Sequence, residues 1–212
     1  MNLVLIGPQG CGKGTQAEKI VEIFELYHVE AGGLIRKRAQ SHDKKAVIIN
    51  HLANQKGQLL PDGVVLDMIF DELDDHPSST GYLFDGYPRT ITQYEALKGM
   101  LAEKKLSLNA ALYIHISDEE TVKRLGSRRL CRVCQKGYSL LLDPGREKCD
   151  CGGELVKRED DEEEAITRRL ALFHENTQPI LNLMRHDEVL VEINGEQPVD
   201  KVFEEIQNKL VM

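Results

Sequence analysis

The chain has 212 residues, of which 41% are hydrophobic and 29% are charged, and its net charge is −8. This length suits one domain with smaller inserted pieces, and this composition is typical of a globular protein. The negative charge makes a nucleic-acid binder a poor fit, because such proteins need a basic surface. No apolar run resembles a membrane span or a signal peptide, so we expect a cytoplasmic protein that binds no membrane.

Short apolar runs alternate along the chain with segments of helical spacing. The apolar runs predict strands at residues 3–6, 82–84, 110–116 and 189–193. Helical spacing predicts helices at residues 13–26, 33–41, 44–55, 62–73, 91–105, 118–129, 161–185 and 198–211. This alternation predicts a parallel sheet with helices on both faces. Residues 30–60 and 127–160 interrupt it, and we interpret both as excursions from one core. The acidic run 160–164 predicts the first turn of a helix, where the helix dipole favours acids.

The most specific motif is Gly7-Pro8-Gln9-Gly10-Cys11-Gly12-Lys13-Gly14-Thr15, which lies between the first predicted strand and the first predicted helix. Glycines let backbone N–H groups approach a polyphosphate, the helix N-terminus adds free amides, and the lysine adds a full charge. In the common form of this loop a hydroxyl that binds Mg²⁺ follows the lysine directly. Here Gly14 takes that place, so we expect Mg²⁺ to be held mainly by phosphates and water.

A second motif places Asp85 at the end of a predicted strand and Arg89 in the turn that follows. The carboxyl ends of parallel strands face the ligand crevice of an open α/β sheet. Asp85 is therefore predicted to reach the Mg²⁺ shell through water, and Arg89 to reach phosphate.

Four of the five cysteines form the pairs Cys131/Cys134 and Cys149/Cys151, a spacing that predicts one tetrahedral zinc site. The second pair is tighter than usual, so a turn at Gly152-Gly153 is needed, and Asp150 is an alternative ligand. Free thiols or a redox pair are the other interpretation. A small insert gains stability from a metal because it cannot bury much core.

Arginines flank the cysteine-rich segment on both sides. Phosphoryl transfer needs positive charge around the transferred group more than it needs a base, and the planar guanidinium suits phosphate. The arginines that we assign to this role are Arg36, Arg89, Arg124, Arg128, Arg129, Arg158, Arg168 and Arg169.

Taken together, these residues resemble the adenylate kinase family in its long form with a zinc-bearing lid. The resemblance rests on the loop at residues 7–15, on the run from Gly81 to Gln93 and on residues 57–62, and it covers nearly the whole chain. It implies an α/β P-loop kinase core with a five-stranded parallel sheet flanked by helices. The core would comprise residues 1–29, 61–126 and 162–212, with a monophosphate-binding insert at 30–60 and a zinc lid at 127–161.

The resemblance also implies a reaction, in which ATP and AMP form two ADP with Mg²⁺ in a monomeric enzyme. It assigns catalysis to Lys13, Asp85, Arg89, Arg124, Arg128, Arg158 and Arg169. It assigns ATP binding to Gly10, Cys11, Gly12, Lys13, Gly14, Thr15, Arg124, Arg128 and the backbone near Gln197. It assigns AMP binding to Ala31, Arg36, Gln58, Leu59, Leu60, Gly86, Tyr87, Pro88, Arg89, Gln93, Arg158 and Arg169, with Gln93 reading the base edge.

Three positions depart from the family pattern. Ala31 stands where the family has a hydroxyl, Gly33 stands where it has an acid, and Ser127 stands where a hinge glycine is common. The first two leave a kinase that prefers another monophosphate as an alternative. A P-loop regulatory protein is disfavoured by Gly14, and a zinc-ribbon nucleic-acid binder is disfavoured by the net charge.

Overall fold

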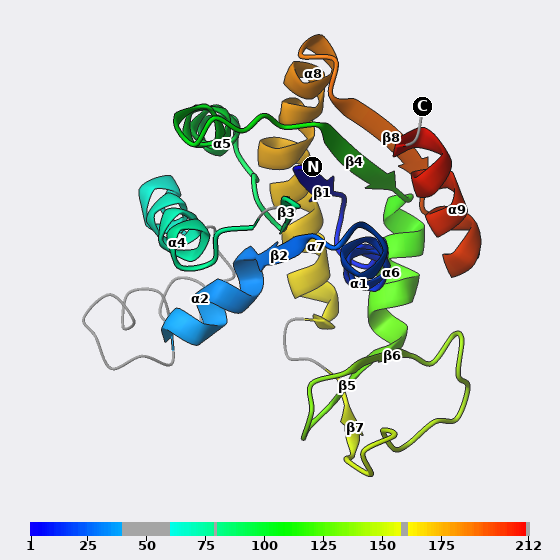
Figure 1. Cartoon of the computed structure of the whole chain (residues 1–212). Coiled ribbons are helices and arrows are strands. Elements are labelled where there is room, and N and C mark those ends of the chain that lie inside the picture. The colour runs from blue at the N-terminus through cyan, green and yellow to red at the C-terminus, as the bar shows by residue number, and fades with distance from the viewer. Residues whose placement is uncertain (40–59, 79, 158–160, 211–212) are drawn as a thin grey trace.

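The computed structural model describes residues 1–39, 60–78, 80–157 and 161–210, and at its centre lies a five-stranded parallel sheet (Figure 1). The spatial order is β2-β3-β1-β4-β8. The strands are β1 (Leu3–Ile6), β2 (Tyr27–Glu30), β3 (Tyr82–Asp85), β4 (Ala110–His115) and β8 (Leu190–Asn194). The predicted α/β fold with a five-stranded parallel sheet is confirmed.

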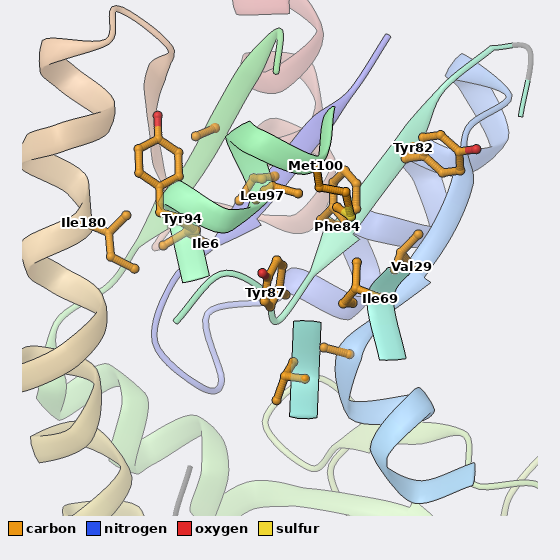
Figure 2. Packing of buried hydrophobic residues seen from close by; sticks show 14 of the residues in the cluster. Ile6, Val29, Ile69, Tyr82, Phe84, Tyr87, Tyr94, Leu97, Met100 and Ile180 are labelled. Atoms are coloured by element: carbon orange, nitrogen blue, oxygen red, sulfur yellow. The ribbon is translucent and has the colours of Figure 1, made fainter. Parts of the chain in front are cut away.

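Helices cover both faces of the sheet because alternate strand residues point to opposite sides. On one face, Leu3 and Leu5 join a buried cluster with Ile20 of α1 (Lys13–Phe24) and Ile206 of α9 (Val199–Leu210). On the other face, Ile6 belongs to a cluster that the remaining core helices complete. These are α4 (Asp62–Asp75), α5 (Ile91–Glu103) and α8 (Gln178–His186). Figure 2 shows this second cluster, which includes the buried ring of Tyr87.

The edge strand β2 was not predicted from the apolar pattern. It pairs in parallel with β3, with Tyr27 opposite Tyr82 and Glu30 opposite Asp85. Only Val29 of its four residues is fully buried, so the segment lacks the continuous apolar run that marks the central strands. Consequently the first residue of the predicted 30–60 insert is the last residue of the sheet's edge strand.

The predicted helix at 161–185 is wrong as a single element. The chain forms α7 (Glu163–Leu172), a π-helical turn η3 (Phe173–Thr177) and then α8. Pro179 lies at the start of α8, where it lacks the N–H that a continuous α-helix would use. A π-helical turn accommodates the change of register.

The cysteine-rich excursion is a small antiparallel sheet of order β6-β5-β7. It comprises β5 (Arg128–Cys131), β6 (Gly137–Ser139) and β7 (Leu155–Val156), and it follows α6 (Asp118–Ser127). Figure 1 shows this sheet at the far end of α6 and α7, away from the central sheet. We call residues 127–161 the lid.

The other excursion begins with α2 (Ala31–Ala39), which starts two residues earlier than predicted. The predicted helix at 44–55 lies outside the described residues. Among the helices that the structure describes, none is both long and apolar enough to cross a membrane.

Candidate active site

The loop between β1 and α1 is shaped by glycines in left-handed conformation. Gly10 has φ +79° and Gly12 has φ +98°, a region that other residues rarely adopt. A Cβ on Gly10 would also lie 3.2 Å from Leu125 of α6, so the loop packs closely against that helix. The predicted glycine loop is therefore present, and its backbone path depends on these residues.

The first turn of α1 offers donors to an anion. Gly12 precedes the helix, no side chain caps it, and the first turn carries no acid. Gly14 and Thr15 are exposed, so their amides and the threonine hydroxyl can reach a ligand. Lys13 Nζ donates to the carbonyl oxygens of Gly7 (2.7 Å) and Pro8 (2.8 Å). The lysine is thus held over the loop, and the whole arrangement suits a polyphosphate.

The side chain of Cys11 is buried, although the residue lies within the loop. It is 2% exposed and belongs to the buried cluster that includes Ile114. Its side chain therefore fills space, and a contact with nucleotide would come from its backbone.

On the acceptor side, β3 ends at Asp85 and a tight turn of Gly86, Tyr87 and Pro88 leads to Arg89. Gly86 has φ +75°, and Arg89 Nε donates to its carbonyl oxygen at 2.8 Å. The buried Tyr87 hydroxyl donates to the carbonyl oxygen of Gln93 (3.1 Å), which anchors the turn to α5. Through the register Leu5 opposite Asp85, this turn emerges beside the phosphate loop, as the motif predicts.

Asp62 connects Gln93, a predicted acceptor residue, to Thr90 at the start of α5. Its carboxylate accepts from Gln93 Nε2 (2.8 Å) and from the Thr90 hydroxyl (3.0 Å). Gln93 Oε1 in turn accepts from the Arg89 backbone N–H at 2.7 Å. The buried amide of Gln93 therefore fixes the turn that carries Arg89, and reading the acceptor base stays a prediction for it.

Arg89 is buried and has charges of both signs near it. Burial lowers the pKa of its guanidinium, the charge of Arg169 lowers it further, and Asp85 opposes both effects. Arg169 in turn lies 3.8 Å from the carboxylate of Asp161. The assignment of both arginines to a phosphoryl group stays a prediction.

Asp161 joins the lid to α7 through two arginines. Its carboxylate accepts from Arg128 Nε (2.7 Å) and Nη2 (2.5 Å), and Arg169 Nη1 lies 3.8 Å away. The side chain of Asp161 is fully buried, whereas both arginines are partly exposed. Of the acidic run that was expected to form the first turn of a helix, Glu163 and Glu164 do occupy that turn of α7, whereas Asp161 precedes the helix and pairs with arginines.

Arg124, which is predicted to bind ATP, joins α6 to the turn after β8. Its Nε donates to Glu120 (2.7 Å) and its Nη2 donates to the carbonyl oxygen of Gly195 (3.0 Å). The neighbouring Gln197 side chain bonds to the Asn194 carbonyl oxygen and to Glu205, so only its backbone remains for the predicted adenine contact. α6 and the turn after β8 are therefore joined next to the phosphate loop.

The four lid cysteines converge as a metal site requires. The sulfur atoms of Cys131, Cys134, Cys149 and Cys151 all lie within 4.8 Å of one another. Backbone N–H groups of Val133 and Cys134 point at Cys131 Sγ (3.4 Å each). The Tyr138 hydroxyl lies 3.1 Å from Cys149 Sγ, and hydrogen bonds from Tyr138 and then from the other cysteines lower the pKa of the Cys149 thiol to about 6. Four sulfur atoms that converge in this way fit a structural Zn²⁺.

Asp150 does not join this cluster. Its carboxylate is engaged by Lys136 (2.7 Å), by the Tyr138 hydroxyl (3.1 Å) and by Arg146, and these partners lower its pKa to about 2. The predicted turn at the second pair is present, since Gly152 has φ +82°. A Cβ on Gly153 would lie 2.6 Å from Cys131 Sγ, so this glycine permits the close approach.

Some predicted acceptor residues lie outside the described part of the chain, namely Gln58, Leu59 and Arg158. Leu60 and Ala31 are described, and both are buried in the core next to the acceptor side. Arg36 lies on α2, where its Nη2 donates to Glu30 at 2.8 Å.

Three residues of the site were not predicted from sequence. Asp62 orders Gln93, Thr177 Oγ1 donates to the Arg89 carbonyl oxygen (3.1 Å), and His28 Nε2 lies 3.7 Å from Asp85 Oδ2. Asp62 follows Pro61 at a helix start, a position that favours acids and was a usable signal. His28 lies on the strand that the apolar pattern did not predict, so no signal placed it here.

Comparison with known proteins gives one consistent result. The model of the family described as adenylate kinase matches residues 5–189. A protein named adenylate kinase from Methanothrix thermoacetophila is 39% identical, with 99% of this chain and 98% of that protein covered. Proteins of the same name from Geobacillus sp. (38% identical, 99% and 98% covered) and Archaeoglobus fulgidus (36%, 98% and 96%) are also similar.

Proposed function

We propose that this chain, which belongs to the adenylate kinase family, transfers the γ-phosphoryl group of ATP to AMP and releases two ADP. Family membership makes it a nucleoside monophosphate kinase. The observation that best supports the proposal is the register that sets the glycine loop beside the Asp85–Arg89 turn at one edge of the sheet. Two phosphate-binding elements with an acid between them suit transfer from one nucleotide to another.

The donor nucleotide is assigned to the loop, α6 and the turn after β8. Gly10 to Thr15 would hold the phosphates of ATP through backbone N–H groups, and Lys13 would add its charge once it leaves the Gly7 and Pro8 carbonyl oxygens. Arg124 and Arg128 would approach ATP from the lid side, and the backbone near Gln197 would contact the adenine.

The acceptor nucleotide is assigned to the opposite side of the same edge. Arg36, Arg89, Arg158 and Arg169 would hold the AMP phosphate and the transferred group. Ala31, Leu60, the 86–88 turn and Gln93 would line the base and ribose, together with Gln58 and Leu59. The environment of Arg89 supports this assignment, because its buried charge beside Arg169 favours an anion.

Mg²⁺ fits the acid at the end of β3. Asp85 would hold it through water, since Gly14 removes the usual hydroxyl ligand and Mg²⁺ keeps several of its waters readily. When bound, the ion neutralises charge that develops on the phosphoryl oxygens.

The chain's own residues then need to position the two nucleotides, shield the donor phosphate from water and stabilise the charge on the transferred group. The AMP phosphate is already ionised, so no general base is required. Arginines provide charge around the equatorial oxygens, and the lid would exclude water from the donor phosphate. We further propose the division into a core (1–29, 61–126 and 162–212), a monophosphate-binding insert (30–60) and the lid (127–161).

The lid cysteines are proposed to hold one structural Zn²⁺. The cytoplasm keeps such thiols reduced, which agrees with a cytoplasmic protein. We treat the chain as a monomer, because one chain supplies every residue assigned to both nucleotides.

An ADP-forming assay with ATP, Mg²⁺ and a panel of nucleoside monophosphates tests the proposal. We expect the highest kcat/KM with AMP, and loss of activity in a Lys13→Met variant that retains its thermal unfolding temperature. A different preferred monophosphate would overturn the choice of AMP as acceptor. The panel is needed because Ala31 and Gly33 depart from the family pattern on the acceptor side. No monophosphate-dependent ADP formation at all would favour a P-loop regulatory protein instead.

A further inference from the structure

The start of α2 brings together one acid, two glycines and one arginine. Glu30 is the last residue of β2, and its Oε1 accepts from Arg36 Nη2 at 2.8 Å. Between them in the chain, Gly32 and Gly33 occupy the first turn of α2. The carboxylate therefore folds back over the start of the helix and meets the arginine one turn later.

The two glycines make room for this ion pair. A Cβ on Gly33 would lie 2.8 Å from Glu30 Oε2, closer than real Cβ contacts, and a Cβ on Gly32 would lie 3.1 Å from Arg36 Nη1. The pair thus occupies the space that side chains at these positions would enter. Where the family pattern has an acid, this chain has Gly33, and the Glu30 carboxylate lies where a side chain of residue 33 would begin.

We propose that Glu30 is a positioning residue for Arg36, and that it supplies from the strand end the carboxylate that the family pattern places at position 33. The inference rests on the proposed function, in which Arg36 binds the acceptor phosphate. It adds a role for an acid that the family motifs do not assign.

The chemistry of the guanidinium allows both partners at once. Arginine has five N–H donors, and Glu30 engages Nη2, so other donors can turn to a phosphate. An arginine already held in one orientation loses less freedom when the phosphate binds. The side chains of Arg36 and Glu30 are 55% and 46% exposed, and an exposed pair of this kind contributes little to folding. Its effect should therefore appear in acceptor binding.

Steady-state kinetics with each substrate varied in turn test this role. We expect Glu30→Gln to raise the KM for AMP about fivefold, the effect of one ordinary hydrogen bond, because the pair is half exposed, while kcat and the KM for ATP stay within about twofold. Gly33→Ala should raise the same KM by pushing the carboxylate aside. The double variant should be no worse than either single variant, because both changes remove one interaction.

A rescue variant and a matched control complete the experiment. Glu30→Ser combined with Gly33→Asp returns the acid to position 33 and should restore the KM for AMP. The control is Glu192→Gln, which breaks the Arg185–Glu192 pair (2.6 Å, 57% and 50% exposed) on the far side of the sheet. It should leave both KM values and the unfolding temperature unchanged.

Two results would overturn the inference. One is an unchanged KM for AMP in Glu30→Gln, and the other is a decrease, which would mean that the carboxylate competes with the phosphate. If wild-type protein forms no ADP from AMP, the proposed function fails. In that case Glu30→Gln would still have to weaken binding of AMP, measured by calorimetry, for the positioning role to stand.

Discussion

At the scale of single residues, Asp161 shows how a buried carboxylate can organise a site without touching a substrate. It lies between Arg128 of the lid and Arg169 of α7, two arginines that we assign to different nucleotides. With that carboxylate in place, both guanidinium groups are held at the junction of lid and core. In the proposed function, these two guanidinium groups meet phosphate oxygens at this junction.

The first prediction concerns Arg89. We expect Arg89→Ala to lower kcat by about 10³-fold or more, since charge-stabilising arginines are worth about 10³–10⁵ in phosphoryl transfer. The variant should still fold, because the 86–89 turn is also fixed by Tyr87 and by the Gln93–Asp62 contacts. Measuring kcat and the unfolding temperature together checks this. Arg89→Lys keeps the charge but not the planar guanidinium, so its kcat should lie between those of the wild type and Arg89→Ala. Near-normal turnover in the alanine variant would remove Arg89 from the catalytic group.

The sequence predicted the candidate site residues better than the residues that form hydrogen bonds and ion pairs with them. Lys13, Asp85 and Arg89 follow from strand ends and glycine turns, which are local features. Asp161 looks the same in sequence as the acids beside it, and only the approach of Arg128 from the lid distinguishes it. Contacts between segments distant in the chain leave no local pattern to read.

At the scale of elements, those with a local sequence pattern were again predicted, and those that depend on distant contacts were not. The three central strands β1, β3 and β4 were predicted because each is a largely buried apolar run. The two edge strands have one buried residue each, and of these β8 was predicted because its sequence is still mostly apolar, whereas β2 is mostly polar and depends on pairing with β3. The break at η3 could not be read from helical spacing, because apolar positions on α7 and α8 continue through it. Pro179 was the available signal.

The lid is the element that would depend most on the metal that we propose for it. Within residues 128–156 the buried apolar side chains are Cys131 and Cys149, while Val133 and Leu142 are each 73% exposed. An antiparallel sheet this small has no hydrophobic core of its own, so its ligands must hold it together.

We therefore predict that removing the metal unfolds the lid before the core. Elemental analysis of protein purified without chelator should find one zinc per chain. Chelation should add a lower-temperature transition to the calorimetric trace and reduce ADP formation, and added Zn²⁺ should reverse both. Cys149→Ser should mimic chelation, whereas Cys11→Ser, outside the cluster, should retain the zinc. A single unchanged transition after complete metal removal would contradict this.

His174 makes a pH-dependent link between elements. Its ring lies between Gln178 of α8 (Nδ1 to Oε1, 2.7 Å) and Asp118 of α6 (Nε2 to both oxygens, 3.0 Å). The hydrogen bond with Gln178 is the main cause that raises its pKa above 6.5, and Asp118 adds to the shift. The protonated ring is therefore the form that joins the start of α6 to η3.

Because the folded pKa of His174 is raised, its contribution to stability is complete below pH 6.5 and is lost as pH rises through the folded value. We predict that His174→Gln lowers the free energy of unfolding at pH 5.5 but has a smaller effect at pH 8.5. The difference should be a few tenths of a kcal/mol, because the ring is 44% exposed. Urea unfolding at both pH values measures it. Asp118→Asn should shrink the pH dependence too, and an equal loss at both pH values would refute the mechanism.

At the scale of the whole molecule, the glycine loop and the Asp85–Arg89 turn lie at one edge of the central sheet, and the lid is attached to the core by α6 and α7. Figure 1 shows both helices running from the central sheet towards the lid. α6 packs on the phosphate loop through Leu125 and on the turn after β8 through Arg124. The glycine loop that we propose to bind the donor is therefore in direct contact with the helix that leads into the lid.

This arrangement predicts the rate of ATP hydrolysis relative to phosphoryl transfer. If the lid covers the donor phosphates, water should be a poor acceptor, and ATP hydrolysis without AMP should be on the order of a thousandfold slower than transfer to AMP. The release of labelled inorganic phosphate, compared with ADP formation under saturating AMP, gives the ratio. The variant Cys131→Ser/Cys134→Ser, which loosens the lid while leaving the glycine loop intact, should lower transfer and raise the share of hydrolysis. Hydrolysis within tenfold of transfer in the wild type, or the same ratio in both proteins, would show that the lid does not exclude water and that acceptor positioning alone selects AMP.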